Sequence, residues 1–493
     1  MTVVDRWVCQ ARCDHVRTSG STGSSDFFLV LRNWVTMNDA RPRCLYSPSV
    51  HPMWPDVSRI LGIAAVEDYT GIPILEFREL LCRLHSSFWR EDSRQKFDDV
   101  PTMFASLPAE VVQQFLKKTL PRLCQMLVSR LPEVHSFPWL PQMSPATISY
   151  KPVDAFLLIG ASFLCLPLMS EDGEVPRMYG TCHLFFTNRP HICAKLHCIL
   201  NYLNIMMAAI SGETSDEIKQ ALLNENRFIE IERLVCNPSY MSEDWGADQS
   251  SLSEIEYKDL FDRIECSREA VHADFANKSL GGGVLRRGCV QEEIRFIISP
   301  ETLLSVLLCE RMGENEAVIV RNTIIFNDYS GYSSSFRCRG FSKDLVSLMS
   351  GTSLTVHLDD ILAIDAIPFG NDKHKQFHMA PLLRELTKCR AGLSYPGAKP
   401  FATGNWGCGV YGGDTQLKAV IQWLAASSCH KRLLFYPFDD KRTAKLPMLV
   451  THARSRGLTV GHIFRLLVKG LTIGFIREDS CIDFLIKSVA GPT

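Results

Sequence analysis

Two adjacent glutamates, Glu292 and Glu293, have the side chains and the spacing for acid–base chemistry. Gln291 precedes them, and a seven-residue spacer separates it from three consecutive glycines, Gly281–Gly283. Apolar residues at helical spacing from 290 to 298 predict that both glutamates lie in the first turn of a short helix. Neighbouring helical residues point about 100° apart. One carboxylate can therefore reach a scissile bond while the other grips a hydroxyl, as cleavage of a glycosidic bond requires.

Two plainer interpretations fit the same stretch. The helix dipole favours an acidic first turn without any catalysis, and for two glutamates alone that is the commoner meaning. A glycine run can also be a flexible tether. The spacing alone therefore leaves all three interpretations open.

A second glycine cluster, "GNWGCGVYGGDT", matches the G-x-G-x-x-G pattern through Gly407, Gly409 and Gly412. The predicted helix 414–427 follows it, and bare backbone N–H groups at a helix N-terminus can hold a phosphate. Asp439 could then bind a ribose, as in a dinucleotide fold. A structural turn fits equally well. The Pro- and Gly-rich approach "SYPGAKPFATGNW" counts against a dehydrogenase, since a long strand should lead into its loop.

Three further stretches carry polar or aromatic groups that suit a nucleotide. "DFAN" at 274–277 offers a carboxylate and an amide for sugar hydroxyls, and "DYSGY" at 328–332 places two tyrosines around a glycine turn. "FYPFDD" puts Phe438 after a predicted strand, where its ring could stack on a base. Each one alone is more often core or loop than a ligand contact.

Together and in this order, these motifs closely resemble the poly(ADP-ribose) glycohydrolase family of the animal type. The G-G-G-x(7)-Q-E-E signature is intact, and the resemblance extends from about Ile255 to Leu467. Upstream, "DAFLLIGASFLCLP" resembles a helix of the family's accessory domain. The resemblance implies an α/β fold: a macrodomain with a mixed central sheet flanked by helices, preceded by a mostly helical domain. It also turns the G-x-G-x-x-G stretch into a diphosphate loop.

The same resemblance implies a role for each carboxylate. Glu293 would protonate the leaving ribose oxygen and then activate water as a general base. Glu292 would hold the hydroxyls of that ribose, helped by Asp274 and Asn277. Residues implied to face the adenine are Gln291, Ile264, Glu265 and Phe438, with Ile264 and Glu265 aligned across a gap. Residues implied to contact sugar and diphosphate are Gly281, Gly282, Gly283, Tyr332, Asn405, Gly407, Gly409, Val410, Tyr411 and Gly412.

The expected activity is hydrolysis of ribose–ribose bonds in poly(ADP-ribose), with release of ADP-ribose mainly from chain ends and without a metal or cofactor. The alternatives are a non-catalytic ADP-ribose reader and, less favoured, a nicotinamide-dependent oxidoreductase. Expected partners are the polymer and poly(ADP-ribosyl)ated proteins, with no direct DNA binding and no membrane. We expect the protein to be located in the nucleus, the cytoplasm or both, and to take part in the DNA damage response. The exposed pair Arg286–Arg287 is interpreted as solvated rather than as a contact to the next polymer unit.

The composition agrees with a soluble enzyme. The chain has 493 residues, 46% hydrophobic and 22% charged, and a net charge of -1, which argues against a general nucleic-acid scaffold. Its 18 cysteines are expected to be reduced, because the start lacks a signal peptide. Neither Cys9, Cys13 and His15 nor the group His191, Cys193, His197 and Cys198 has a second half at zinc-finger spacing. The apolar window 155–169 is short for a membrane span and favours a buried helix.

The elements that must position these groups change character along the chain. The predicted organisation is a flexible segment at 1–26, a helical accessory region at 27–225, a catalytic macrodomain at 226–475 and a tail at 476–493. Helical spacing dominates up to about 225, as in 108–131 and 191–210. Beyond it, strands are predicted at 316–320, 354–358, 360–369 and 432–438. Alternation with helices predicts helices around a central sheet.

Overall fold

In the computed structural model, the described residues are 44–65, 73–89, 93–134, 136–169, 180–236, 242–353 and 355–490. They all belong to one compact unit, residues 31–493. The predicted flexible segment 1–26 and the Cys9, Cys13 and His15 group lie outside the described residues.

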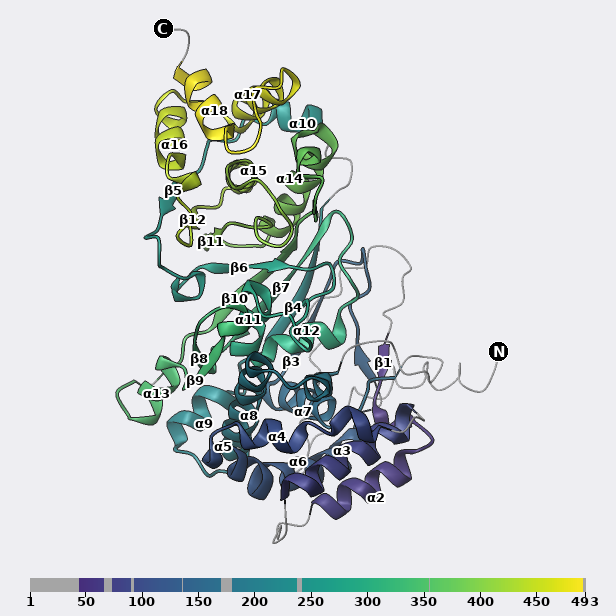
Figure 1. The fold of residues 1–493 in the computed structure, drawn as a ribbon. Helices are drawn as coiled ribbons and strands as arrows, with labels where there is room; N and C mark the ends of the chain where they lie inside the picture. Colours follow the sequence, from purple (N-terminus) through teal and green to yellow (C-terminus); the bar gives the residue numbers. More distant parts are fainter. Residues whose placement is uncertain are drawn as a thin grey trace, which may run out of the picture. The chain divides into compact units, whose positions relative to one another are not determined.

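The first part of the described chain is mostly helical, as the spacing predicts (Figure 1). On the 108–131 stretch, Val112, Phe115 and Leu116 are buried, and a π-helical turn at Phe115–Thr119 joins two α-helices. A short antiparallel pair, β1 (Cys44–Tyr46) and β2 (Ser136–Pro138), accompanies these helices. The helices are α2 (Trp54–Ala64), α3 (Pro73–Trp89), α4 (Val100–Ala105), α5 (Ala109–Gln114), α6 (Leu120–Arg130), α7 (Pro152–Phe163), α8 (Pro190–Ile210) and α9 (Asp216–Leu223).

Two of these helices are apolar on nearly every face. The predicted buried helix is α7, whose residues from Asp154 to Phe163 are all buried. Among the described residues, α8 is the one helix long and apolar enough to cross a membrane by length and composition, and 89% of its apolar window is buried inside the protein. Such burial is typical of a core helix.

An eight-stranded mixed sheet forms the centre of the second part, in the order β3-β4-β7-β10-β6-β11-β12-β5. The five strands from β10 to β5 in that order run parallel to one another, whereas β7, β4 and β3 continue the sheet with antiparallel pairing. The strands are β3 (Ala146–Tyr150), β4 (Ile229–Val235), β5 (Ile255–Tyr257), β6 (Val271–Ala276), β7 (Glu316–Thr323), β10 (Asp359–Asp365), β11 (Phe401–Gly404) and β12 (Leu433–Tyr436). A separate hairpin, β8 (Asn327–Ser330) and β9 (Arg337–Phe341), carries the "DYSGY" stretch.

Helices cover the sheet, as expected of a macrodomain. Because side chains alternate along a strand, Val271 and Ala273 of β6 enter the core with α14 (Met379–Leu393) and α15 (Thr415–Ser428), while Asp274 points to the other face. There α11 (Gln291–Ile298) lies against β6 and α8 (Figure 1). The remaining helices are α10 (Ser242–Ala247), α12 (Leu303–Leu308), α13 (Lys343–Met349), α16 (Leu446–Ser455), α17 (Val460–Thr472) and α18 (Cys481–Ala490).

Three sequence-based expectations need correction or refinement. The strand predicted at 354–358 is wrong, since residues 355–358 are irregular and the main chain at His357 donates to the Asp344 side chain instead of a neighbouring strand. The expected tail at 476–493 contains α18, whose Cys481 and Leu485 are buried in the core. Strand β3 falls inside the region expected to be helical but pairs with β4 in the main sheet. The domain boundaries themselves stay predictions.

Candidate active site

The predicted site residues gather where the parallel strands end. Asn277 follows β6, Asn405 follows β11, and Phe438 comes two residues after β12. The carboxyl ends of parallel strands meet at one edge of a sheet, and this edge is where α/β folds bind ligands. Residues that are far apart in the sequence therefore come together here.

The two glutamates at the start of α11 have different partners. Glu293 accepts hydrogen bonds from the main-chain N–H groups of Gly283 and Val290, both at 2.8 Å. Glu292 accepts one from the main-chain N–H of Asn277 at 3.0 Å. Both side chains are largely buried; Glu293 is only 6% exposed. Both carboxylates thus lie at the N-terminal end of α11. Glu293 is fixed to the glycine loop, residues 281–288, whereas Glu292 is fixed to the end of β6.

The glycine loop makes room for these carboxylates. At Gly282, whose φ is +50°, an added Cβ would lie 2.7 Å from Glu293 Oε1 and still closer to Glu292 Oε2. At Gly288, a Cβ would lie 2.5 Å from Glu293 Oε1. Gly281 is instead buried against Val306. The resemblance assigned the glycines to the ligand alone; the structure shows that the protein's own acids already occupy part of that space.

Gly288 is a position next to Glu293 that the sequence reasoning missed. It lies in the spacer "VLRRGCV", and a glycine just before an acidic helix start was the available signal. Its importance depends on the folding of Glu293 back onto the loop, which residue spacing does not reveal.

Asp274, Glu292 and Glu293 form an acidic cluster, of which Asp274 is the most deeply buried member. It is 0% exposed, and neither of its carboxylate oxygens has a hydrogen-bond partner among the described residues; Glu292 Oε1 also lacks one there. Burial, and next the neighbouring charge of Glu293, raises the pKa of Asp274 well above its usual range. Burial, followed by repulsion from Asp274 and Glu293, does the same to the pKa of Glu292. Proton sharing thus relieves a cluster in which full ionisation is costly.

Gln291 closes a gap in the sheet. Strands β6 and β11 pair only through Val271 and His272 of β6, and then separate. Beyond that point the Gln291 side chain accepts a hydrogen bond from the N–H of Phe275 and donates one to the carbonyl of Ala273, both at 2.8 Å. These contacts satisfy main-chain groups that a neighbouring strand would otherwise pair. They fix the start of α11 to β6, and the contact of Gln291 with adenine stays a prediction.

Two tyrosines connect the acidic cluster to the surrounding loops. Asn277 Nδ2 donates to the hydroxyl of Tyr411 at 2.8 Å, which joins the end of β6 to the second glycine loop. The N–H of Gln291 donates to the Tyr332 hydroxyl at 3.2 Å, which joins α11 to the "DYSGY" turn. The structure thus brings together four of the motifs that the sequence analysis considered separately.

The second glycine loop is open to solvent. Gly407 and Gly412 both have a φ of +72°, a conformation that favours glycine. Gly409 is exposed and Val410 is 81% exposed. Asp414 caps α15 by accepting a hydrogen bond from the N–H of Leu417 at 2.8 Å. A carboxylate therefore already occupies the helix N-terminus that a dinucleotide fold would offer to phosphate.

Phe438 and Tyr332 form an exposed aromatic pair, with ring centroids 5.8 Å apart. Phe438 is 57% exposed, and its φ of +52° is uncommon for a side chain of this size. Strained backbone of this kind is concentrated at functional sites. Asn405 donates to the carbonyl of Pro437 at 2.7 Å, so it braces the loop just before Phe438.

The gap-aligned residues Ile264 and Glu265 lie beside this edge. Ile264 is buried in a small cluster with Ala402 and Tyr436. Glu265 accepts a hydrogen bond from the Tyr329 hydroxyl at 2.5 Å, and the Arg263 guanidinium lies 4.7 Å from the Tyr329 ring centroid.

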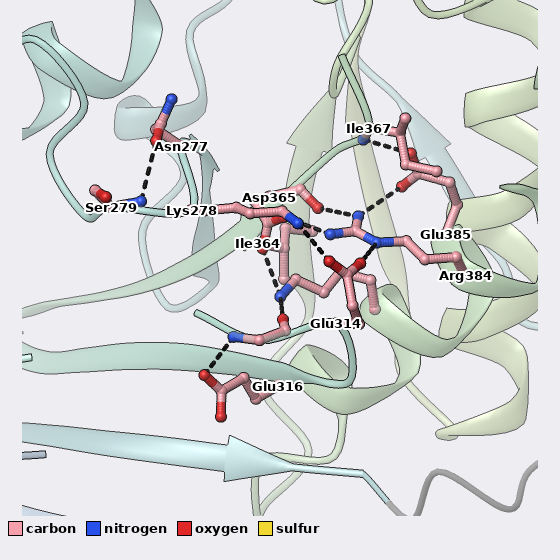
Figure 2. Close-up of polar contacts among 12 residues, drawn as sticks. Asn277, Lys278, Ser279, Glu314, Glu316, Ile364, Asp365, Ile367, Arg384 and Glu385 are labelled. Carbon is pink, nitrogen blue, oxygen red and sulfur yellow. Dashed lines mark hydrogen bonds and ion pairs between the residues drawn. The ribbon is translucent and has the colours of Figure 1, made fainter. Parts of the chain in front are cut away.

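A network of charged groups supports the loop that follows β6 (Figure 2). Lys278 pairs with Glu314, whose other oxygen lies 2.7 Å from Arg384 Nε on α14. Arg384 also binds Asp365 at the end of β10 at 2.5 Å. Because Lys278 follows Asn277 directly, this network ties the site to both β10 and α14.

No arrangement of three or more His, Cys, Asp or Glu side chains suited to a metal ion occurs within the described ranges. The His191, Cys193, His197 and Cys198 group lies in those ranges, on α8. Arg286 and Arg287 are exposed. Exposure fits both interpretations of this pair, so the preference for solvated side chains stays a prediction.

Two family models match the chain. Residues 107–233 match "Poly (ADP-ribose) glycohydrolase (PARG), helical domain", and residues 242–445 match "Poly (ADP-ribose) glycohydrolase (PARG), Macro domain fold". Together they cover more than half of the chain. Both the helical region and the macrodomain fold expected from the resemblance are thereby confirmed.

Individual relatives carry the same family name. Poly(ADP-ribose) glycohydrolase 1 of Caenorhabditis elegans is 33% identical over 240 residues, which are 46% of this chain and 30% of that protein. Poly(ADP-ribose) glycohydrolase 1 of Arabidopsis thaliana is 28% identical over 420 residues, 68% of this chain and 71% of that protein. A crystal structure of poly(ADP-ribose) glycohydrolase from Thermomonospora curvata is 15% identical, with a TM-score of 0.30 over 50% of this chain and 89% of that chain. On the two family models, the chain belongs to the poly(ADP-ribose) glycohydrolase family.

Proposed function

We propose that this chain hydrolyses the ribose–ribose glycosidic bonds of poly(ADP-ribose) and releases ADP-ribose mainly from chain ends. The observation that carries the proposal is the position of Glu293. Its carboxylate is fixed by two main-chain N–H groups, beside Glu292 and the glycines at 282, 283 and 288. Fixed geometry of this kind is what a general acid or base needs.

The reaction divides into two proton transfers. Glu293 donates a proton to the leaving ribose oxygen as the glycosidic C–O bond breaks, and positive charge develops on the anomeric carbon. Glu293 then takes a proton from water, and the resulting hydroxide completes the bond to that carbon. Glu292 holds the hydroxyls of the ribose being cleaved, and its attachment to the N–H of Asn277 keeps it at the end of β6.

The open side of the site binds the nucleotide. The adenine stacks on Phe438, whose ring is exposed next to that of Tyr332. Within the loop 407–412, the exposed main chain at Gly409 and Val410 contacts the diphosphate through its N–H groups. Asp274, being completely buried, acts on the ribose through its neighbours rather than by contact.

The test is an assay for free ADP-ribose. Purified chain is incubated with poly(ADP-ribose), and the products are identified by mass spectrometry at several early times. The proposal predicts monomeric ADP-ribose from the first time point. Polymer binding without release would indicate a reader, and NAD(P) binding without polymer binding would indicate an oxidoreductase. Early accumulation of long fragments would contradict cleavage from chain ends.

The proposal also covers the partners and the cellular location of this activity. Its partners are poly(ADP-ribosyl)ated proteins, in the nucleus, the cytoplasm or both, as part of the DNA damage response. Fluorescence of the tagged chain before and after DNA strand breaks tests the setting. Recruitment to the damaged sites supports it, and an unchanged distribution outside both compartments contradicts it.

A further inference from the structure

Lys195 is a buried cation that binds the glycine loop, residues 281–288. It contacts the side of this loop that faces away from Glu293. It lies on α8, in the helical region, and is 0% exposed. Its Nζ donates to the carbonyls of Gly283 at 3.3 Å, Val284 at 2.9 Å and Arg286 at 3.0 Å, and more closely to that of Gly288. One ammonium group thus gathers four carbonyls from a six-residue segment, 283–288.

These carbonyls are the ammonium's hydrogen-bond partners, and none of the described carboxylates forms an ion pair with it. Burying a charge on neutral acceptors alone is costly. Burial lowers the pKa of Lys195 to about 8, while nearby Cys289, Glu293 and Cys198 act in the opposite direction. His191, one turn earlier on α8, is titratable as well, and its pKa is lowered first by burial and then by the charge of Lys195. A lysine buried at such a cost needs a reason beyond packing.

The reason lies on the other side of the loop. Gly283, whose carbonyl accepts from Lys195, donates its own N–H to Glu293 Oε1. Gly288, the closest acceptor, is also the glycine whose Cβ would strike that oxygen. The loop therefore lies between Lys195 and Glu293, and its carbonyls turn toward the first while an N–H turns toward the second.

We infer that Lys195 is a positioning residue, which holds the segment 283–288 so that Glu293 is correctly placed for proton transfer. This inference rests on the proposed function for its catalytic part. It also gives the helical region a task in catalysis, because the Lys195 side chain reaches the loop from α8. Lys195 does not touch the substrate and acts through the loop alone.

Lys431 offers a matched control at the opposite edge of the sheet. It is also a buried lysine that donates to loop carbonyls, those of Tyr395 at 2.8 Å and Gly397, just before β11. Burial lowers its pKa as well. Replacing it removes the same kind of contact without approaching Glu293.

The experiment compares Lys195→Met, Lys195→Arg and Lys431→Met in the full chain. Amide hydrogen exchange, read by mass spectrometry, is measured first because it needs no activity. We expect faster exchange at 281–290 in Lys195→Met and at 395–400 in Lys431→Met, with each variant leaving the other segment unchanged. Unchanged exchange at 281–290 in Lys195→Met would overturn the inference, whatever the chain's activity.

Kinetics then separate positioning from general destabilisation. Lys195→Met should lose about 100-fold in kcat, since small displacements of a catalytic group have effects of this size, while its affinity for ADP-ribose stays near the parental value. Lys431→Met should keep kcat within about twofold. Lys195→Arg, which keeps the charge and donors, should recover part of the lost kcat. The parental kcat should decline above pH 8 with a limb that Lys195→Met lacks.

Equal losses of kcat in the two methionine variants would reduce Lys195 to a structural residue and overturn its positioning role. A parental chain that releases no ADP-ribose would instead contradict the proposed function. The exchange result would still decide whether Lys195 holds the loop.

Discussion

The two glycine-rich loops at the carboxyl edge of the sheet differ in what faces their missing side chains. In the loop 281–288, the protein's own carboxylates occupy the space that Cβ atoms would need at Gly282 and Gly288. In the loop 407–412, a Cβ at Gly407 would meet the Ala366 Cβ at 2.5 Å, but none of the described atoms lies within 4 Å of a Cβ added at Gly409, and the neighbouring Val410 is exposed. The two loops thus differ most at Gly288 and Gly409, where one missing side chain faces an internal acid and the other faces solvent.

This difference shows how to interpret a glycine motif. On the proposed function, the first loop holds the catalytic carboxylates, so substitutions there should reduce kcat. On the same proposal, the open main chain of the second loop binds the ligand, so substitutions near it should change KM. The comparison can be tested by adding one methyl group to each loop and by changing the residues beside them.

Among the substitutions in the two glycine loops, the largest effect is expected from Gly288→Ala. The new Cβ would lie 2.5 Å from Glu293 Oε1 and 2.8 Å from the Cα of Gly283. Glu293 must then move away from its two N–H donors, and we expect a loss of about 100-fold in kcat. Steady-state kinetics on poly(ADP-ribose) measure this loss. A variant that changed KM alone would break the distinction between the loops.

Phe438→Ala should act on binding instead. Removing a ring that stacks on a base should raise KM for the polymer about 10-fold, with kcat nearly unchanged because the acidic cluster is not touched. Calorimetric titration with ADP-ribose provides an independent check. An unaltered affinity would remove Phe438 from the adenine site.

Asp274→Asn should reveal the strain in the acidic cluster through pH dependence. Because the folded pKa of Asp274 is raised above the ordinary 3.8, its protonated form contributes stability that is complete below that value and is lost as pH rises toward the folded pKa. The amide does not titrate, so the parental chain should lose about 1 kcal/mol more stability than the variant between pH 5 and pH 8.

Thermal unfolding of both proteins at pH 5 and pH 8 measures that difference. The parental Tm should fall more than the variant's as pH rises. Parallel pH dependence in the two proteins would show that Asp274 is not under the electrostatic strain that its burial implies.

The smallest effect is expected from Gly409→Ala, the counterpart of Gly288→Ala. Its φ is not in the left-handed region and its Cβ would point into open space. The value of kcat should therefore stay within about twofold of the parental value, and the free energy of unfolding should be nearly unchanged. A loss of kcat as large as that of Gly288→Ala would mean that both loops position catalytic groups.

Local sequence patterns predicted the elements that position the site. The apolar spacing after Gln291 placed the start of α11 correctly, and the small residues before 414 placed the second loop ahead of α15. Strands β7, β10 and β12 were also predicted, because each is a short apolar run bounded by turn residues. These features depend on neighbours in the sequence.

The features that were missed depend on tertiary contacts. β3 lies among helices in the sequence and becomes a strand by pairing with β4. Residues 355–358, from the stretch predicted as a strand, are irregular and pair with none of the described strands. Lys195 and Gly288 come from different regions, and their roles appear only when α8 meets the loop. The burial of Asp274 likewise follows from the packing of α11 on β6.

The most direct test of the account is Glu293→Gln, which keeps the shape of the side chain and removes its acid. We measure kcat on poly(ADP-ribose) and the Kd for ADP-ribose on the same preparation. The account predicts a fall in kcat of about 1,000-fold, within the range for a lost general acid–base group, with a Kd close to the parental value. Turnover near the parental rate would contradict the assignment of Glu293 as the catalytic acid.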